Sequence, residues 1–365
     1  MNSSVRNLMR EATRLTRSGQ LQEATAAIQR ALGRSAPADA GVRPAAASPV
    51  QAEVLDGLVF ESGAGNRVDE GEAPGVRPDA ASGRGDFRSG THSQAGLTRA
   101  YKLYAPPGAA GRALPLVVML HGCTQSPDDF AAGTAMNQHA REQGFFVLYP
   151  AQSQDANPSR CWNWFKHNHQ RRGSGEPAVL AGMTVAVMQQ HGIDARRVFV
   201  AGLSAGGAMA AIVAATYPEL FAAVGVHSGL ASGAAGNLSE ALAAMQGGGR
   251  DPAGPPTAVP TIVFHGDQDR TVHPRNGERV IAAVRASGAA GARVEQGTCG
   301  QGRRYTRSAD APASGSAAAE HWLVHGAGHA WSGGQAAGTY TDSKGPDASR
   351  EMLRFFFAHP KPHVH

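Results

Sequence analysis

Apolar and polar residues follow two repeating patterns along residues 97–359 of the chain. Short continuous apolar runs are typical of buried strands, and the longer segments between them place apolar residues at helical spacing. Strands that alternate with helices predict a mostly parallel sheet covered by helices on both faces, which is an α/β fold. Strands are expected at residues 99–104, 116–120, 145–149, 198–202, 222–227, 261–265 and 321–324, and helices at residues 130–143, 177–190, 205–217, 276–286 and 347–359.

The N-terminal part of the chain has a different pattern. Residues 1–34 repeat apolar positions at helical spacing on both sides of a Ser-Gly break, which predicts a short helical hairpin. Residues 35–96 are rich in Ala, Pro, Gly and Ser and contain few large apolar side chains, so we expect a linker. The predicted organisation is therefore a hairpin at 1–34, a linker at 35–96 and an α/β domain at 97–359.

Composition and charge exclude several classes of protein. The chain has 365 residues, of which 42% are hydrophobic and 17% charged, as in a globular protein. Its net charge of +5 is scattered and no binding motif accompanies it, so we expect no nucleic-acid partner. The apolar runs are too short to cross a bilayer, and the charged N-terminal residues lack the apolar core of a secretory signal. We therefore expect a cytoplasmic protein without a membrane span.

The cysteines are too few for a disulfide framework. They are Cys123, Cys161 and Cys299. Cys123 and Cys161 are expected in loops at the same end of the sheet. Because a persistent disulfide is unusual in the cytoplasm, the sequence leaves open whether these two residues are bonded.

The segment GLSAG at residues 202–206 places a serine between a buried strand and a helix. This G-x-S-x-G pattern has chemical meaning in that context, because a tight turn raises the hydroxyl above the sheet at a helix N-terminus. The residues two before and two after the serine must be very small, and here they are Gly202 and Gly206. Ser204 is therefore the candidate nucleophile.

A serine nucleophile needs a base, and the base needs a group that orients it. Asp267 and Asp269 both follow the strand expected at 261–265, and we favour Asp269 because the residues before it give the chain room to turn. His329 follows the last expected strand on a glycine-rich loop. The candidate triad is therefore Ser204, Asp269 and His329, in the chain order that this arrangement requires.

The negative charge that develops on an attacked carbonyl requires two N–H donors. One is expected from Ala205, directly after the serine, and the other from the loop after an early strand. Cys123 is the candidate for the second donor, with Thr124 as the alternative.

Taken together, these segments resemble the polyhydroxybutyrate depolymerase family of esterases, which is similar to feruloyl and acetylxylan esterases. The resemblance covers residues 97–358 and implies an α/β-hydrolase fold, the same triad and no cofactor. The sequence differs from secreted members of this family, because it has no recognisable signal peptide and no evident separate substrate-binding domain. Its helical N-terminus is similar to that of intracellular members, which favours stored polymer or its soluble oligomers as substrate. The matching motifs are LHGCTQ at 120–125, CWNWF at 161–165, GLSAGG at 202–207, HGDQDRTV at 265–272 and GAGHAWSGG at 326–334.

The sequence thus predicts a serine esterase that hydrolyses poly(3-hydroxybutyrate) or its oligomers. Trp162, Trp164 and Trp331 are expected to line the cleft, because flat apolar walls suit an uncharged polyester. One alternative is a carbohydrate esterase that removes feruloyl or acetyl groups. Another is a granule-associated binding protein anchored by the N-terminal hairpin. The expected partners are an ester substrate and polymer granules, and the sequence does not indicate an oligomeric state.

Overall fold

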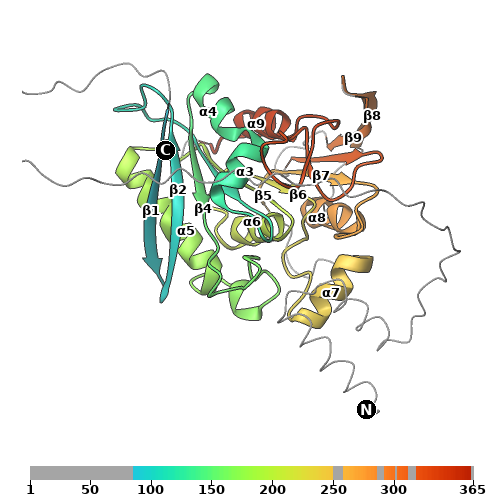
Figure 1. Ribbon diagram of the computed structural model, residues 1–365, viewed down its shortest axis with the longest axis horizontal. Coiled ribbons are helices and arrows are strands. Elements are labelled where there is room, and N and C mark those ends of the chain that lie inside the picture. Colours follow the sequence, from blue (N-terminus) through green and yellow to red (C-terminus); the bar gives the residue numbers. More distant parts are fainter. Residues whose placement is uncertain (1–84, 250–257, 286–291, 301, 311–317, 363–365) are drawn as a thin grey trace, which may run out of the picture. The chain divides into compact units, whose positions relative to one another are not determined.

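All residues that the structure describes lie within one unit of the chain, Gly75–His365. The predicted hairpin at 1–34, and the predicted linker up to residue 84, lie outside the described residues. The computed structural model describes residues 85–249, 258–285, 292–300, 302–310 and 318–362 (Figure 1).

One large sheet organises the described residues, with strand order β1-β2-β4-β3-β5-β6-β7-β10-β9-β8. The six central strands, from β4 to β10, are parallel, and antiparallel strands extend the sheet on both sides. The strands are β1 Asp86–Gln94, β2 Leu97–Ala105, β3 Leu116–Leu120, β4 Phe146–Pro150, β5 Val198–Leu203, β6 Ala223–His227, β7 Thr261–Gly266, β8 Ala292–Thr298, β9 Arg304–Asp310 and β10 Ala319–Val324, while β11 Trp331–Ser332 and β12 Thr341–Asp342 pair separately.

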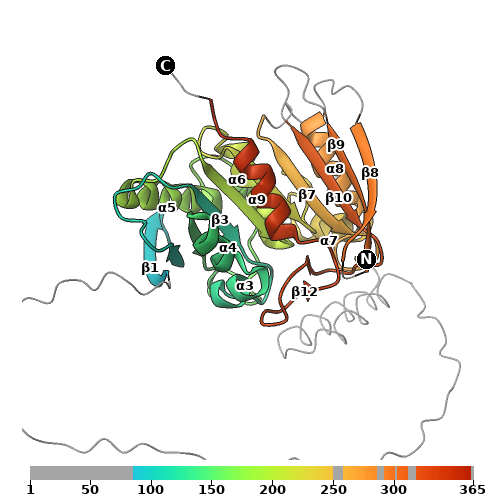
Figure 2. The same cartoon turned by 90° about the horizontal axis from the view of Figure 1, so that it is seen from above.

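Helices cover both faces of this sheet (Figures 1 and 2). Side chains of α5, α6, α7 and α8 belong to one cluster of buried apolar residues, and those of α3, α4 and α9 belong to another. The helices are α3 Pro127–Thr134, α4 Met136–Gln143, α5 Gly175–His191, α6 Ala205–Thr216, α7 Leu238–Gly247, α8 Arg275–Arg285 and α9 Ala348–Ala358, with a short 3-10 helix at His167–His169.

The apolar side chains of β3 explain why its sequence is continuously apolar. Leu116, Val118 and Leu120 belong to the first cluster, whereas Val117 and Met119 belong to the second. Successive residues of a strand point to opposite faces, so a strand covered on both faces needs apolar residues at every position. The expected α/β architecture, a mostly parallel sheet with helices on both faces, is confirmed.

The differences from the expected elements have local causes. The helix expected at 130–143 is two helices, because Ala135 adopts a left-handed conformation with φ of 53°. The linker was expected to reach residue 96, but β1 occupies Asp86–Gln94. Most residues of β1 and β8 are exposed, so these edge strands lack the apolar runs that reveal central strands. Among the described residues, no helix has the length and apolar character required to cross a bilayer.

The pairing of β1 predicts how the domain tolerates truncation. β1 pairs with all of β2 and packs against α5. We expect a chain that begins at Gly85 to melt close to the full chain. A chain that begins at Leu97 should melt about 5 °C lower or more, because the edge of β2 is left unpaired. Thermal unfolding of the two truncated chains tests this, and equal melting temperatures would show that β1 is dispensable.

Candidate active site

The candidate residues lie at one edge of the sheet, where the central parallel strands end. Ser204 follows β5, Asp269 follows β7 and His329 follows β10. The carboxyl ends of parallel strands meet at a common edge, and ligand sites of open α/β sheets form there. Segments far apart in the sequence are therefore brought to one place by the topology.

Ser204 occupies the sharp turn that its sequence pattern predicts. Its φ is 57° and its ψ is −119°, a conformation that residues other than glycine rarely adopt. Its N–H donates to the carbonyl of His227 at 2.9 Å, and its own carbonyl accepts from the Ala208 N–H at 2.9 Å. The turn is thus fixed from both sides, with the serine at the N-terminus of α6.

The glycines around Ser204 are required by close backbone packing. A Cβ on Gly202 would overlap the backbone of Gly206, and a Cβ on Gly206 would overlap the carbonyl of Leu120 at the end of β3. The first turn of α6 therefore lies directly against β3 and β5. This close approach brings Ser204 next to the loop that follows β3.

Asp269 is held in a turn by its own carboxylate. Its Oδ1 accepts the N–H of Thr271 at 2.9 Å and the N–H of Val272 at 2.8 Å, and its side chain is buried. Burial raises the pKa of this carboxyl, but hydrogen bonds from His265, His329 and the Val272 N–H outweigh burial. The net pKa is well below its usual range, so Asp269 is ionised at neutral pH.

His329 contacts Asp269 directly. Its Nδ1 lies 2.7 Å from Asp269 Oδ2. Because an ionised carboxylate only accepts, Nδ1 carries a proton, and in the neutral form of the ring Nε2 has a free lone pair. Asp267 has a different role, since it accepts the Gly326 N–H at 2.7 Å and pairs with His325 at 2.9 Å. Asp267 thus shapes the start of the loop that carries His329.

Ser204 and His329 are linked through His227 rather than by a direct bond. Among the described residues, no hydrogen bond joins the Ser204 side chain to His329. The carbonyl of His227 holds the Ser204 N–H, and its ring Nε2 accepts the N–H of Ser332 at 2.9 Å. His227 therefore connects the turn of Ser204 to the loop that carries His329. In enzymes, the hydrogen bond between two catalytic side chains is often long without substrate and shortens only when substrate binds.

His227 was not singled out by the sequence, although it is a polar residue at the end of a buried strand. Its ring stacks on Trp331 with 5.0 Å between the ring centroids. Burial, and to a smaller extent the proximity of the His265 and His329 rings, lowers the pKa of His227 well below its usual value. The neutral ring keeps Nε2 free to accept the Ser332 N–H.

The loop at residues 121–125, which we call the β3 loop, follows the end of β3 and contains the candidate donor Cys123. The Gly122 N–H donates to Gln125 Oε1 at 2.9 Å, and the Thr124 N–H donates to the Ser159 carbonyl at 2.6 Å. Within the part of the chain that the structure describes, the Cys123 N–H has no partner. Ala205 is the first residue of α6, so its N–H has no acceptor within the helix.

Three contacts, from Cys161, Trp162 and Gln152, hold the β3 loop in place. Cys123 forms a disulfide with Cys161, which answers the question that the sequence left open. The indole of Trp162 donates to the His121 carbonyl at 3.1 Å, and the Gln152 N–H donates to His121 Nε2 at 3.1 Å. The motif CWNWF therefore includes two direct anchors for this loop.

A buried carboxylate anchors the same motif to the domain. Glu176 is fully buried and accepts the backbone and side-chain N–H groups of Asn163, both at 2.7 Å. The Arg99 guanidinium lies 3.5 Å from Glu176 and compensates its charge. Sequence reasoning missed this network, because its members are scattered from β2 to α5.

The three tryptophans were expected to line the cleft, but the structure places all three in the buried core. Trp162, Trp164 and Trp331 are 0%, 5% and 1% exposed and belong to the two core clusters. Trp331 is enclosed by Phe130 and His227, and its indole donates to Ser349 Oγ at 3.0 Å. Large apolar rings gain more by burial than by exposure, so these side chains serve packing and loop anchoring.

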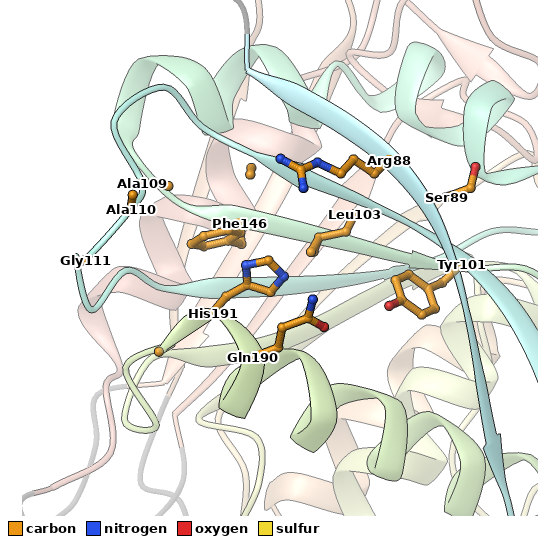
Figure 3. A pocket seen from close by; sticks show the side chains of 12 residues that line it. Arg88, Ser89, Tyr101, Leu103, Ala109, Ala110, Gly111, Phe146, Gln190 and His191 are labelled. Carbon is orange, nitrogen blue, oxygen red and sulfur yellow. The ribbon is translucent and has the colours of Figure 1, made fainter. Parts of the chain in front are cut away.

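Two cavities lie at opposite ends of the sheet, and one of them is next to the edge that carries Ser204. A cavity of about 440 Å³ borders the β3 loop and is lined mostly by polar side chains, including Gln125, Gln152 and Arg160. A second cavity, of about 500 Å³, is lined by Arg88, Phe146 and other residues (Figure 3). Phe146 is the first residue of β4, so the second cavity lies at the opposite end of the sheet from Ser204. No cluster of metal-ligating side chains is present among the described residues.

Comparisons with known proteins find similarity to esterases. The family described as "Esterase PHB depolymerase" matches residues 99–295, which is more than half of the chain. Poly(3-hydroxyalkanoate) depolymerase C of Paucimonas lemoignei is 33% identical over 193 residues, covering 49% of this chain and 46% of that protein. A probable acetylxylan esterase A of Neosartorya fischeri is 35% identical over 132 residues, covering 36% of this chain and 35% of that protein. The chain thus spans less than half the length of these relatives.

The fold has a counterpart among solved structures. An acetyl xylan esterase from Aspergillus awamori superposes with a TM-score of 0.56 at 20% sequence identity. The match covers 75% of this chain and 99% of that structure. This likeness, with the sheet order and the turn at Ser204, identifies the α/β-hydrolase fold.

Buried neutral histidines predict that the protein loses stability in weak acid. Burial lowers the pKa of both His121 and His321 to about 4. In the unfolded chain both take up protons below pH ~6.5, so stability is full above pH ~6.5 and is lost as the pH falls toward 4. Each should contribute about 1.4 kcal/mol per pH unit in that window. Urea unfolding at pH 7.5 and 5 measures the loss, and His321→Leu should make it smaller. Equal unfolding free energies at both pH values would contradict the buried neutral state.

The disulfide predicts the reactivity of the cysteines. In the unreduced protein, unfolded in denaturant, iodoacetamide should label only Cys299, which is the free cysteine. After reduction it should label all three. The reduced protein should be less stable by about 3 kcal/mol, because the bond closes a 38-residue separation. Mass spectrometry of protein from its native cells gives the result, and labelling of Cys123 and Cys161 without reduction would show that the pair is not bonded there.

Proposed function

Because the chain belongs to the PHB depolymerase family of esterases, we propose that it is a carboxylic ester hydrolase with Ser204 as nucleophile. The observation that carries this proposal is the strained Ser204 turn at the same sheet edge as the Asp269–His329 pair. Strain of this kind is stored where function requires it. A protein that only binds polymer granules has no need for such a turn, so we place catalysis before the granule-binding alternative.

In the proposed mechanism His329 acts as the base. Asp269 holds the Nδ1–H, so Nε2 takes the proton from Ser204 Oγ as this oxygen attacks the ester carbonyl. The tetrahedral intermediate collapses when His329 returns the proton to the leaving alcohol, which leaves an acyl group on Ser204. Water then attacks the acyl group by the same route and releases the acid.

The N–H groups of Cys123 and Ala205 are the proposed donors to the oxyanion. Cys123 is favoured over Thr124 because the Thr124 N–H already binds the Ser159 carbonyl. The disulfide and the Trp162 hydrogen bond hold the Cys123 N–H in place before the reaction. Donors fixed in advance stabilise the transition state, and losing one typically costs about 3 kcal/mol.

The proposed substrate is an ester of a short 3-hydroxy acid, either in a polymer or in its soluble oligomers. The family and the Paucimonas relative support this choice, since both are named for polyhydroxyalkanoate depolymerases. The buried tryptophans give no added support to binding of a long polymer chain. Binding to granules remains part of the proposal to be tested.

A second candidate substrate is an acetylated or feruloylated sugar. The cavity beside the β3 loop has a mostly polar lining, which suits the hydroxyl groups of a carbohydrate. Product analysis separates the two candidates. Incubation with amorphous polyhydroxybutyrate, hydroxybutyrate dimer, acetylated xylan and methyl ferulate should release hydroxybutyrate from the first two substrates. Release of acetate or ferulate alone would favour the carbohydrate esterase.

An oxidising compartment is the alternative to the expected cytoplasmic location. Persistent disulfides are rare in reducing compartments, so the Cys123–Cys161 bond favours an oxidising one. In that case the substrate is polymer outside the cytoplasm rather than stored granules. The cysteine labelling described above decides between the two locations.

The triad assignment makes a quantitative prediction. Ser204→Ala should abolish turnover of a soluble ester and leave the melting temperature near that of the wild type. Asp269→Asn should lower kcat by roughly 10⁴, because the imidazole then loses its correct tautomer. Asp267→Asn is the matched control, since Asp267 pairs with His325 instead. An active Asp269→Asn protein beside an inactive Asp267→Asn protein would reverse the assignment.

A further inference from the structure

His265 lies beneath the proposed orienting carboxylate. It is on β7, four residues before Asp269, and its side chain is fully buried. Its Nε2 lies 2.8 Å from the Val272 carbonyl and 3.5 Å from Asp269 Oδ2. Because a carbonyl oxygen only accepts, Nε2 carries the proton and its N–H points toward both oxygens.

This N–H completes the turn that holds Asp269. The carboxylate accepts the backbone N–H groups of Thr271 and Val272, while the Val272 carbonyl is held by His265. The turn is therefore attached to β7 at one end and closed by the carboxylate at the other. Loss of the His265 donor would free the Val272 carbonyl and let the carboxylate rotate away from His329.

The opposite side of the His265 ring is enclosed by α8 and β10. Its Nδ1 and the Nε2 of His321 are buried and have no hydrogen-bond partner among the described residues. Both nitrogens lie against Gly277 of α8, and a Cβ on this glycine would lie 2.8 Å from His265 Nδ1 and 3.2 Å from His321 Nε2. A distance of 2.8 Å is shorter than a van der Waals contact, so an alanine would push the rigid ring.

We propose that His265 is a positioning residue that orients Asp269, and that Gly277 is glycine in order to leave room for the His265 ring. This inference rests on the proposed role of Asp269. It accounts for a glycine inside the first turn of a helix, where alanine is the better helix former. It also gives a role to a buried histidine that touches neither Ser204 nor the β3 loop in the described structure.

The test compares four variants in the full chain by their kcat and KM for p-nitrophenyl butyrate and by their melting temperatures. His265→Leu removes the donor, and His265→Gln keeps an N–H donor at a similar reach. Gly277→Ala moves the ring without changing it. Val263→Ala is the matched control, because Val263 is a buried residue on the same face of β7 and has no role in the turn.

The expected result is a loss of kcat at constant KM. His265→Leu should lower kcat by about tenfold to a hundredfold, Gly277→Ala by about fivefold or more, and His265→Gln should recover most of the activity. Val263→Ala should lower the melting temperature and keep its kcat. A merely structural His265 would instead behave as Val263→Ala does, with stability lost and kcat retained.

Several results would overturn the proposal. The proposal is wrong if His265→Leu or Gly277→Ala keeps the wild-type kcat. It is also wrong if His265→Gln is as inactive as His265→Leu. If His265→Leu does not fold, the Gln variant and Gly277→Ala still decide the question. Ser204→Ala and Asp269→Asn in the same assay test the proposed function itself. If both are inactive while His265→Leu is fully active, only the positioning role is wrong.

Discussion

The close packing of α6 against β3 and β5 is the constraint on which the rest of the site depends. Gly206 lies against the Leu120 carbonyl, and Gly202 lies against Gly206, so no side chain fits between these backbones. The approach forces Ser204 into its strained turn and places it beside the loop that begins after Leu120. One packing requirement thus sets the relative position of the proposed nucleophile and the proposed oxyanion donor.

Buried histidines then fix the other parts of the site through backbone groups. His121 binds the Gln152 N–H, His227 binds the Ser332 N–H and His265 binds the Val272 carbonyl. Each of these bonds attaches a loop to the end of a strand, and the first two require a neutral ring. The positions of the site loops therefore depend on the protonation of His121 and His227, although neither has a proposed role in contacting the substrate.

The sequence predicted most of the central sheet, because β3 to β7 are buried at every position and consist mainly of apolar residues. It also placed Ser204, Asp269 and His329 on loops that the fold brings to one edge. It could not predict β8, whose residues are mostly exposed, or β9, whose residues are mostly half-buried, because neither strand has a clear apolar pattern. It also missed the network of Glu176, whose partners are distant in sequence. The tryptophans were misplaced because residue type alone does not distinguish a packed ring from a binding surface.

Covalent labelling of Ser204 tests the central claim most directly. A fluorophosphonate ester reacts with a serine only where a base and an oxyanion site activate it. The account predicts one adduct per chain, on the peptide that contains Ser204, and a loss of this adduct in Asp269→Asn protein. No adduct in the folded wild-type protein, or an adduct on a different residue, would contradict it.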